Sequence, residues 1–173
     1  LYNQTPLCQL YIEYYSDKAS GFRDYKSYGV FAGAGNNYST LYYKIFNLKN
    51  PSKYNIFELG LGTNDKNIPS TMGDNGSCGG SLAAAYHFLK GDVNIYGADI
   101  DTKIVGNNFD WRKFNLPDSK SIKTFYCDQT HPETIQHMWE CDDLKDKQMD
   151  IIIEDGLHTF AAMLCFAQNS IHK

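Results

Sequence analysis

The sequence has 173 residues with a formal net charge of -4, and 42% of its residues are hydrophobic. This composition is typical of one folded globular domain, and the negative charge argues against a protein that binds nucleic acid or anionic membranes by bulk electrostatics. No apolar run is long enough to span a bilayer, and the five cysteines are scattered without a CxxC pair, which predicts a cytoplasmic protein with neither a zinc ribbon nor a thioredoxin-type site.

The first fifty residues differ in composition from the rest. Residues 11–15 are rich in tyrosine, residues 29–37 are rich in glycine and asparagine, and residues 38–46 carry apolar side chains at helical spacing. We predict that residues 1–50 form an aromatic-rich, partly helical segment, which either closes over a site as a lid or covers the sheet. Residues 51–173 then form the main domain.

From residue 55 onward, strand-like and helix-like segments alternate. Strands are predicted at residues 55–59, 93–98, 121–127 and 149–153. Helices are predicted at residues 81–90 and 159–170, and a third begins where Thr130, Pro132 and Glu133 form a capping pattern. The alternation predicts an α/β fold with a doubly wound parallel sheet, in which ligands bind beyond the carboxyl ends of the strands.

The first predicted strand ends in Glu58-Leu59-Gly60-Leu61-Gly62. The third glycine of a dinucleotide fingerprint would fall at Asp65, and the Gly-Lys-Ser/Thr of a P-loop is absent. A carboxylate at Glu58 is a poor neighbour for pyrophosphate and a good one for a cationic or amino-bearing ligand. An ordinary strand-to-loop turn is an equal alternative at this point.

The second and third predicted strands also end in polar residues. Asp99, with Asp101 as a second candidate, can accept two hydrogen bonds from ribose hydroxyls. Asp128 and Gln129 can hydrogen-bond an adenine edge. For the aspartates, a helix cap is the competing role.

The fourth predicted strand is followed by Glu154-Asp155-Gly156-Leu157-His158, the segment richest in reactive groups. Asp155 can bind a divalent cation through hard oxygen ligands. His158 can act as a general base near neutral pH.

Taken together, these segments resemble the class I S-adenosylmethionine-dependent methyltransferases. Residues 56–170 resemble, more narrowly, the macrocin O-methyltransferase and cephalosporin-hydroxylase-like branch. The matching segments are FELGLGT, GGSL, IYGADID, IKTFYCDQ and DIIIEDGLHTF, preceded by SDK and NNYSTLYYKIF. The resemblance implies a Rossmann-like fold and S-adenosylmethionine as cofactor, bound by Glu58, Gly60, Gly62, Thr63, Asp99, Ile100, Asp128 and Gln129. It also implies magnesium at Asp155 and His158 as the base.

The function expected from this resemblance is methyl transfer to a hydroxyl of a small molecule or a sugar, in natural-product or surface-polysaccharide tailoring. A nicotinamide-dependent oxidoreductase and a non-catalytic cofactor-binding module are the alternatives. The family has seven strands, whereas this sequence reaches Lys173 directly after the helix that follows strand four. We therefore expect that the last strands are absent, and that the chain is a piece of a longer protein or that a partner, such as a second copy, covers the fourth strand.

Overall fold

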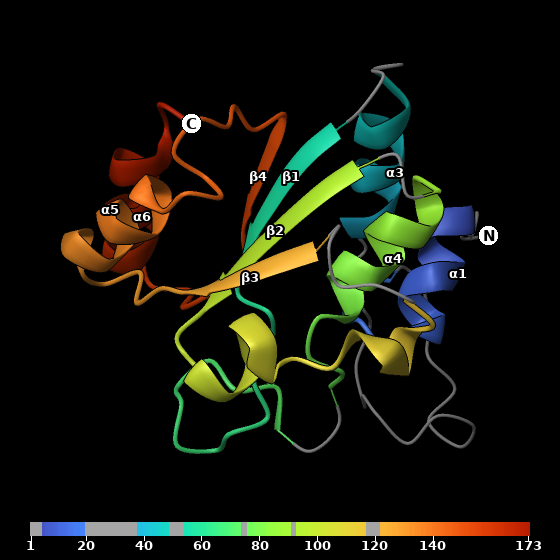
Figure 1. Ribbon diagram of the computed structural model, residues 1–173. Helices are drawn as coiled ribbons and strands as arrows, with labels where there is room; N and C mark the ends of the chain where they lie inside the picture. The colour runs from blue at the N-terminus through green and yellow to red at the C-terminus, as the bar shows by residue number, and fades with distance from the viewer. Residues whose placement is uncertain (1–4, 20–37, 49–53, 74–75, 91–92, 117–121) are drawn as a thin grey trace.

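The computed structural model describes residues 5–19, 38–48, 54–73, 76–90, 93–116 and 122–173. Within them, four parallel strands form one sheet in the order β3-β2-β1-β4 (Figure 1). The strands are β1 (Tyr54–Leu59), β2 (Val93–Asp99), β3 (Ile122–Tyr126) and β4 (Ile151–Glu154). The chain moves outward from β1 to β3 and then returns to the other side of β1, which confirms the predicted doubly wound sheet and places its switch point between β1 and β4.

Helices cover both faces of the sheet (Figure 1). One face carries α1 (Pro6–Glu13), α3 (Tyr38–Leu48) and α4 (Gly80–Phe88), and the other carries α5 (Pro132–Glu140) and α6 (Phe160–Ser170). Successive residues of β1 therefore enter different cores. Ile56 packs in the core beneath α1 and α4, whereas Phe57 packs against Trp139 and Phe166 in the other core, with ring centroids 4.5 and 6.1 Å away.

The ends of two helices follow from local sequence. Thr5 caps α1 by accepting a hydrogen bond from the Cys8 amide at 3.1 Å, and a proline occupies the first turn. Thr159 caps α6 by accepting from the Ala162 amide. The helices predicted at residues 38–46 and 159–170 are confirmed, while the predicted loop at residues 29–37 lies outside the described residues.

The predicted cap of α5 was wrong. His131 is the N-cap residue and its side chain makes no cap hydrogen bond. Thr130 instead points back to Asp128, whose Oδ1 accepts from the Thr130 amide at 2.9 Å and from its hydroxyl at 2.6 Å. The hydroxyl of Thr134, in the first turn of α5, donates to the Asp128 carbonyl at 2.6 Å, so Asp128 and Thr130 form a turn ahead of the helix and Thr130 does not cap it.

The strand connection between β2 and β3 was also not predicted. It contains the short 3-10 helices η2 (Thr102–Ile104), η3 (Gly106–Asn108) and η4 (Trp111–Phe114). Such short turns lack the 3.6-residue periodicity by which longer helices are found in a sequence.

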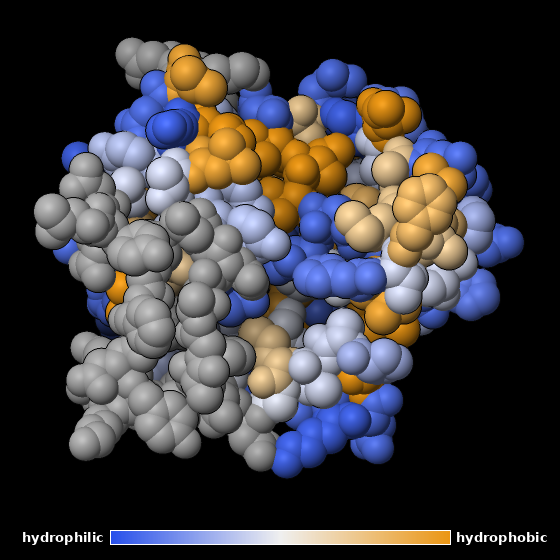
Figure 2. All heavy atoms as spheres, turned by 180° about the vertical axis from the view of Figure 1, so that it is seen from behind, coloured by the Kyte–Doolittle hydropathy of each residue, from blue (hydrophilic) through white to orange (hydrophobic). Residues whose placement is uncertain are grey.

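Strand β4 forms the edge of the described sheet, where it pairs with β1 on one side. Large apolar side chains are exposed on α3 and on α6 and its C-cap, among them Leu48 at 79%, Phe160 at 80% and the C-cap residue Ile171 at 88%. Figure 2 shows hydrophobic atoms gathered in the upper half of the face seen from behind. Among the described strands, β4 is therefore an edge strand. None of the described helices has the length and apolar character needed to cross a membrane.

Candidate functional site

Two adjoining cavities, of about 480 and 240 Å³, lie beyond the carboxyl ends of the strands. They occupy the switch point between β1 and β4, the position at which parallel sheets bind ligands. A shared wall is formed by Gly60, Pro69, Ser70, Asp99, Gly156 and Leu157.

The glycine turn after β1 is shaped by the backbone of the β4 loop. Gly60 has a φ of +91°, and a Cβ atom there would lie 2.2 Å from the carbonyl oxygen of Asp155. Gly62 has a φ of +79°, and its Cβ would lie 2.3 Å from the side chain of Met72. Gly60 lines both cavities and Gly62 lines the first. The glycines are therefore required by the protein itself, whatever ligand they also contact.

Asp99 organises this turn and also lines both cavities. Its Oδ2 accepts a hydrogen bond from the Leu61 amide at 2.8 Å, and its Oδ1 accepts from the Asp101 amide at 2.9 Å. Asp99 is 6% exposed, and burial raises its pKa above the ordinary value. Asp101, the second ribose candidate, caps η2 by accepting from the Lys103 amide and lines neither cavity.

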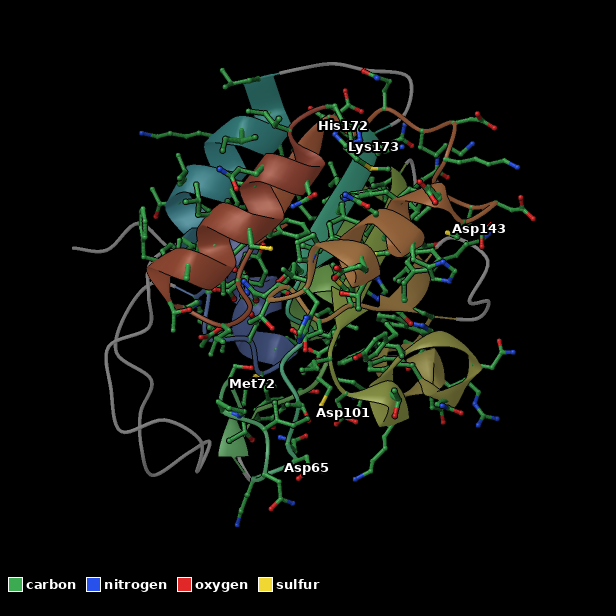
Figure 3. All side chains as sticks on the ribbon, turned by 90° about the vertical axis from the view of Figure 1, so that its left-hand side faces the viewer. Asp65, Met72, Asp101, Asp143, His172 and Lys173 are labelled. Carbon is green, nitrogen blue, oxygen red and sulfur yellow. The ribbon has the colours of Figure 1, made fainter. Side chains whose placement is uncertain are left out.

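Thr63 supports the loop that walls the cavities. It is 1% exposed, lines neither cavity and donates its hydroxyl to Asp101. Its carbonyl accepts from the Met72 amide at 2.8 Å, and Asp65 pairs with Lys103 at 2.8 Å. Figure 3 shows Asp65, Met72 and Asp101 at the end of the molecule away from the C-terminal residue Lys173. This arrangement fixes residues 64–73 over the strand ends.

The second cavity is lined by Ile100, Asp128 and Gln129, as well as by the shared wall. Ile100 is 38% exposed and offers an apolar surface. Gln129 is 6% exposed, and its polar atoms are engaged by the protein: Nε2 donates to Glu154 Oε1 at 2.9 Å, and Oε1 accepts from the Leu157 amide. Gln129 therefore ties the end of β3 to the loop after β4.

Lys18 is the main site residue that the sequence analysis did not identify. It is 3% exposed, and its Nζ lies 3.0 Å from Glu58 Oε1 and donates to Asp155 Oδ2. Burial lowers the pKa of Lys18, but the two carboxylates outweigh this and raise it well above the ordinary value. The only sequence signal for Lys18 was its place in the SDK segment.

Glu58 lies behind Lys18, away from the cavities. It is 2% exposed, lines neither cavity, and accepts the Ser81 hydroxyl at 2.8 Å in addition to the lysine. From the sequence, we expected its negative charge to face a ligand. In the structure, the Glu58 carboxylate instead pairs with the ammonium group of Lys18.

Asp155 connects Lys18 to His158. While Lys18 contacts Asp155 Oδ2, His158 Nε2 lies 3.2 Å from Asp155 Oδ1, and the imidazole is 64% exposed at the first cavity. A carboxylate can only accept, so this contact assigns the proton to Nε2 and leaves the Nδ1 lone pair of a neutral ring free.

A magnesium ion at Asp155 does not fit the described residues. Magnesium requires several oxygen ligands in octahedral geometry. Within the described ranges, no group of three His, Cys, Asp or Glu side chains could hold a metal, and the Asp155 carboxylate is already paired with Lys18. The other described carboxylates of the cavity do not combine with Asp155 into a set of metal ligands.

No family model and no curated protein matches this chain. Among solved structures, the MycE methyltransferase from the mycinamycin biosynthetic pathway, in complex with Mg and SAH, matches 98% of the chain with a TM-score of 0.65 and 20% sequence identity. The fold is Rossmann-like. At this sequence identity, the structural similarity supports the fold only. The chain spans 34% of the length of MycE.

Proposed function

We propose that this chain binds S-adenosylmethionine and forms part of an O-methyltransferase. The observation that carries the proposal is the charge of the first cavity, whose described lining residues include the carboxylates Asp17, Asp99 and Asp155 and one ammonium group, that of Lys18. Such a surface attracts a cationic sulfonium and repels a pyrophosphate. It therefore favours this cofactor over a nicotinamide dinucleotide, and the SAH bound in MycE supports the same choice.

The two cavities suit the two halves of the cofactor. In this proposal the nucleoside lies in the second cavity, with its ribose at Asp99 and its adenine against Ile100 and near Asp128. The methionine end lies in the first cavity, beside Gly60 and Gly62. Gln129 contributes to this binding mainly by holding the cavity wall, because its side chain is already hydrogen-bonded on both sides.

His158 is the base in this proposal. Asp155 holds the imidazole through Nε2, so Nδ1 accepts the proton of an acceptor hydroxyl, and the resulting oxygen can attack an electrophile in line. S-adenosylmethionine, when bound, supplies the methyl group. The acceptor is a hydroxyl of a small molecule or a sugar, in natural-product or surface-polysaccharide tailoring.

Calorimetry with S-adenosylhomocysteine and with NAD, each added to the purified chain, tests the cofactor. We expect heat with S-adenosylhomocysteine and none with NAD; the absence of heat with the former would end the proposal, and heat with NAD would favour the oxidoreductase.

The base is tested with a panel of phenol and sugar acceptors by measuring S-adenosylhomocysteine formation. His158→Ala should abolish turnover and spare cofactor binding, whereas His137→Ala, on the exposed side of α5, should leave both turnover and cofactor binding unchanged. Unchanged turnover in His158→Ala would remove it as the base.

The metal requirement is tested separately with a chelator. The described residues predict that turnover survives, because Asp155 pairs with Lys18 and no described group of three ligating side chains could hold a metal. Loss of turnover that magnesium restores would show that ligands outside the described residues complete a metal site.

A further inference from the structure

The amino-acid end of S-adenosylmethionine carries a carboxylate as well as an ammonium group. Acidic residues of the first cavity can take the ammonium, but the carboxylate needs a hydrogen-bond donor and, in a site this acidic, a positive charge. Among the described residues that line the first cavity, His158 aside, the one cationic side chain is Lys18.

Lys18 is held ready for such a contact. An ammonium group has three N–H donors, and within the described residues two of them are used, by Glu58 and Asp155. The side chain lines the cavity next to Gly60 and Ser81, so the third donor is left for a ligand. Because the two carboxylates already fix the rotamer, little further side-chain entropy is lost on binding.

A second source of positive potential lies beside Lys18. Helix α4 begins at Gly80, and its N-cap residue Gly79 provides no side-chain cap. Gly80 and Ser81 line the same cavity, and although the Gly80 amide already donates to the Ser77 carbonyl, the dipole of this nine-residue helix favours a negative group in the cavity that Lys18 also lines.

We propose, resting on the function proposed above, that Lys18 binds the carboxylate of the cofactor's amino-acid end and that Glu58 acts through Lys18. The ammonium group of the same ligand then pairs with Asp17 or Asp155, which line the cavity near Lys18. A zwitterion is thus recognised by a lysine and an aspartate, and the buried glutamate sets the position of the lysine.

The test combines a truncated ligand with a substitution. S-adenosylhomocysteine and 5′-methylthioadenosine share the nucleoside and the thioether sulfur, but the second lacks the amino-acid end. In Lys18→Met, we expect affinity for S-adenosylhomocysteine to fall about 10- to 100-fold, as for loss of a charge-assisted hydrogen bond, while affinity for 5′-methylthioadenosine changes less than about twofold. Isothermal calorimetry measures both.

Two further variants serve as controls for this experiment. Lys18→Met leaves the buried Glu58 without its cationic partner, so the double variant Lys18→Met/Glu58→Gln, which removes both charges, keeps the test available if the single variant unfolds. Lys113→Met is the control: Lys113 is an exposed lysine that donates to the Cys78 carbonyl at 3.0 Å and lines neither cavity. It should leave both affinities unchanged.

The outcomes separate this assignment from the proposed function. If neither ligand binds the wild-type chain, the proposed function fails and the role of Lys18 falls with it. If both bind the wild type, and the Lys18 variants weaken both ligands equally or neither, the assignment of Lys18 alone is overturned. If both Lys18 variants fail to fold, the residue serves stability and the assignment is equally overturned.

Discussion

Gln129→Ala should cost this protein about 3 kcal/mol of unfolding free energy. The side chain is 6% exposed and makes two hydrogen bonds, one to the Glu154 carboxylate at 2.9 Å and one from the Leu157 amide. A hydrogen bond to a charged group contributes about 1.5–3 kcal/mol and one between neutral groups about 1 kcal/mol. The two contributions add because the truncation removes both hydrogen bonds and leaves no replacement for Gln129 beside the Glu154 carboxylate and the Leu157 amide, in a largely buried position.

Urea unfolding followed by circular dichroism measures this loss. With a slope of about 2 kcal/mol per M, the midpoint should fall by about 1.5 M at unchanged slope. Gln136→Ala is the matched control, since Gln136 is exposed and bonds Asn169 at 3.2 Å between α5 and α6; its effect should stay within about 0.5 kcal/mol. A loss below about 1 kcal/mol in Gln129→Ala would refute the tie between β3 and the β4 loop. Weaker S-adenosylhomocysteine binding at unchanged stability would instead favour the adenine contact expected from the sequence.

Three other predictions concern the turn, the core and the pH dependence. Gly60→Ala should destabilise by about 3 kcal/mol or more in thermal unfolding, because the new methyl group would lie 2.2 Å from a backbone oxygen of the β4 loop at a φ of +91°. Trp139→Phe should cost about 2–3 kcal/mol in the same assay, since the indole is 1% exposed and its N–H donates to the Ser170 hydroxyl at 2.9 Å; a loss under 1 kcal/mol would contradict this. The hydrogen bond from Lys103 lowers the pKa of Asp65 to about 2, so its stabilising contribution is present above about pH 4 and is lost as the pH falls toward 2. NMR titration should show this pKa rising toward the ordinary value in Lys103→Ala, and an unchanged pKa would exclude Lys103 as the cause.

The sequence predicted the sheet because its strands are signalled by local pattern. Residues 55–59 and 93–98 match β1 and β2 to within one residue at each end, since both are buried on two faces and end at polar or glycine residues. The fourth strand was predicted at residues 149–153 and begins at Ile151 in the structure, because Met149 instead donates its amide to the carbonyl of Lys173. Apolar character alone could not indicate that pairing.

The site was predicted less completely because its main contact joins distant parts of the chain. Lys18 and Asp155 are 137 residues apart, and no periodicity or spacing in the sequence indicates that their side chains meet. The aspartates at the strand ends could be found individually. In the structure, Asp99 faces the cavities and Asp101 caps a turn. These different roles depend on the backbone groups that each carboxylate contacts after folding, which the sequence does not show.

Glu58 influences the charge of the site through Lys18 and not by lining a cavity. An acid at the end of the first strand does require a cation, but Lys18 supplies it, and Glu58 with Lys18 and Asp155 forms a group with a net charge of -1 when the lysine is protonated and both carboxylates are ionised. One buried carboxylate with one buried lysine would have left the cavity nearly neutral. The second carboxylate, together with Asp17 and Asp99, keeps the cavity negative while still presenting one fixed ammonium group. Such a surface favours a ligand that carries a carboxylate, an ammonium group and one further positive charge over a ligand that carries a pyrophosphate. The spacing of the glycines alone does not indicate this preference.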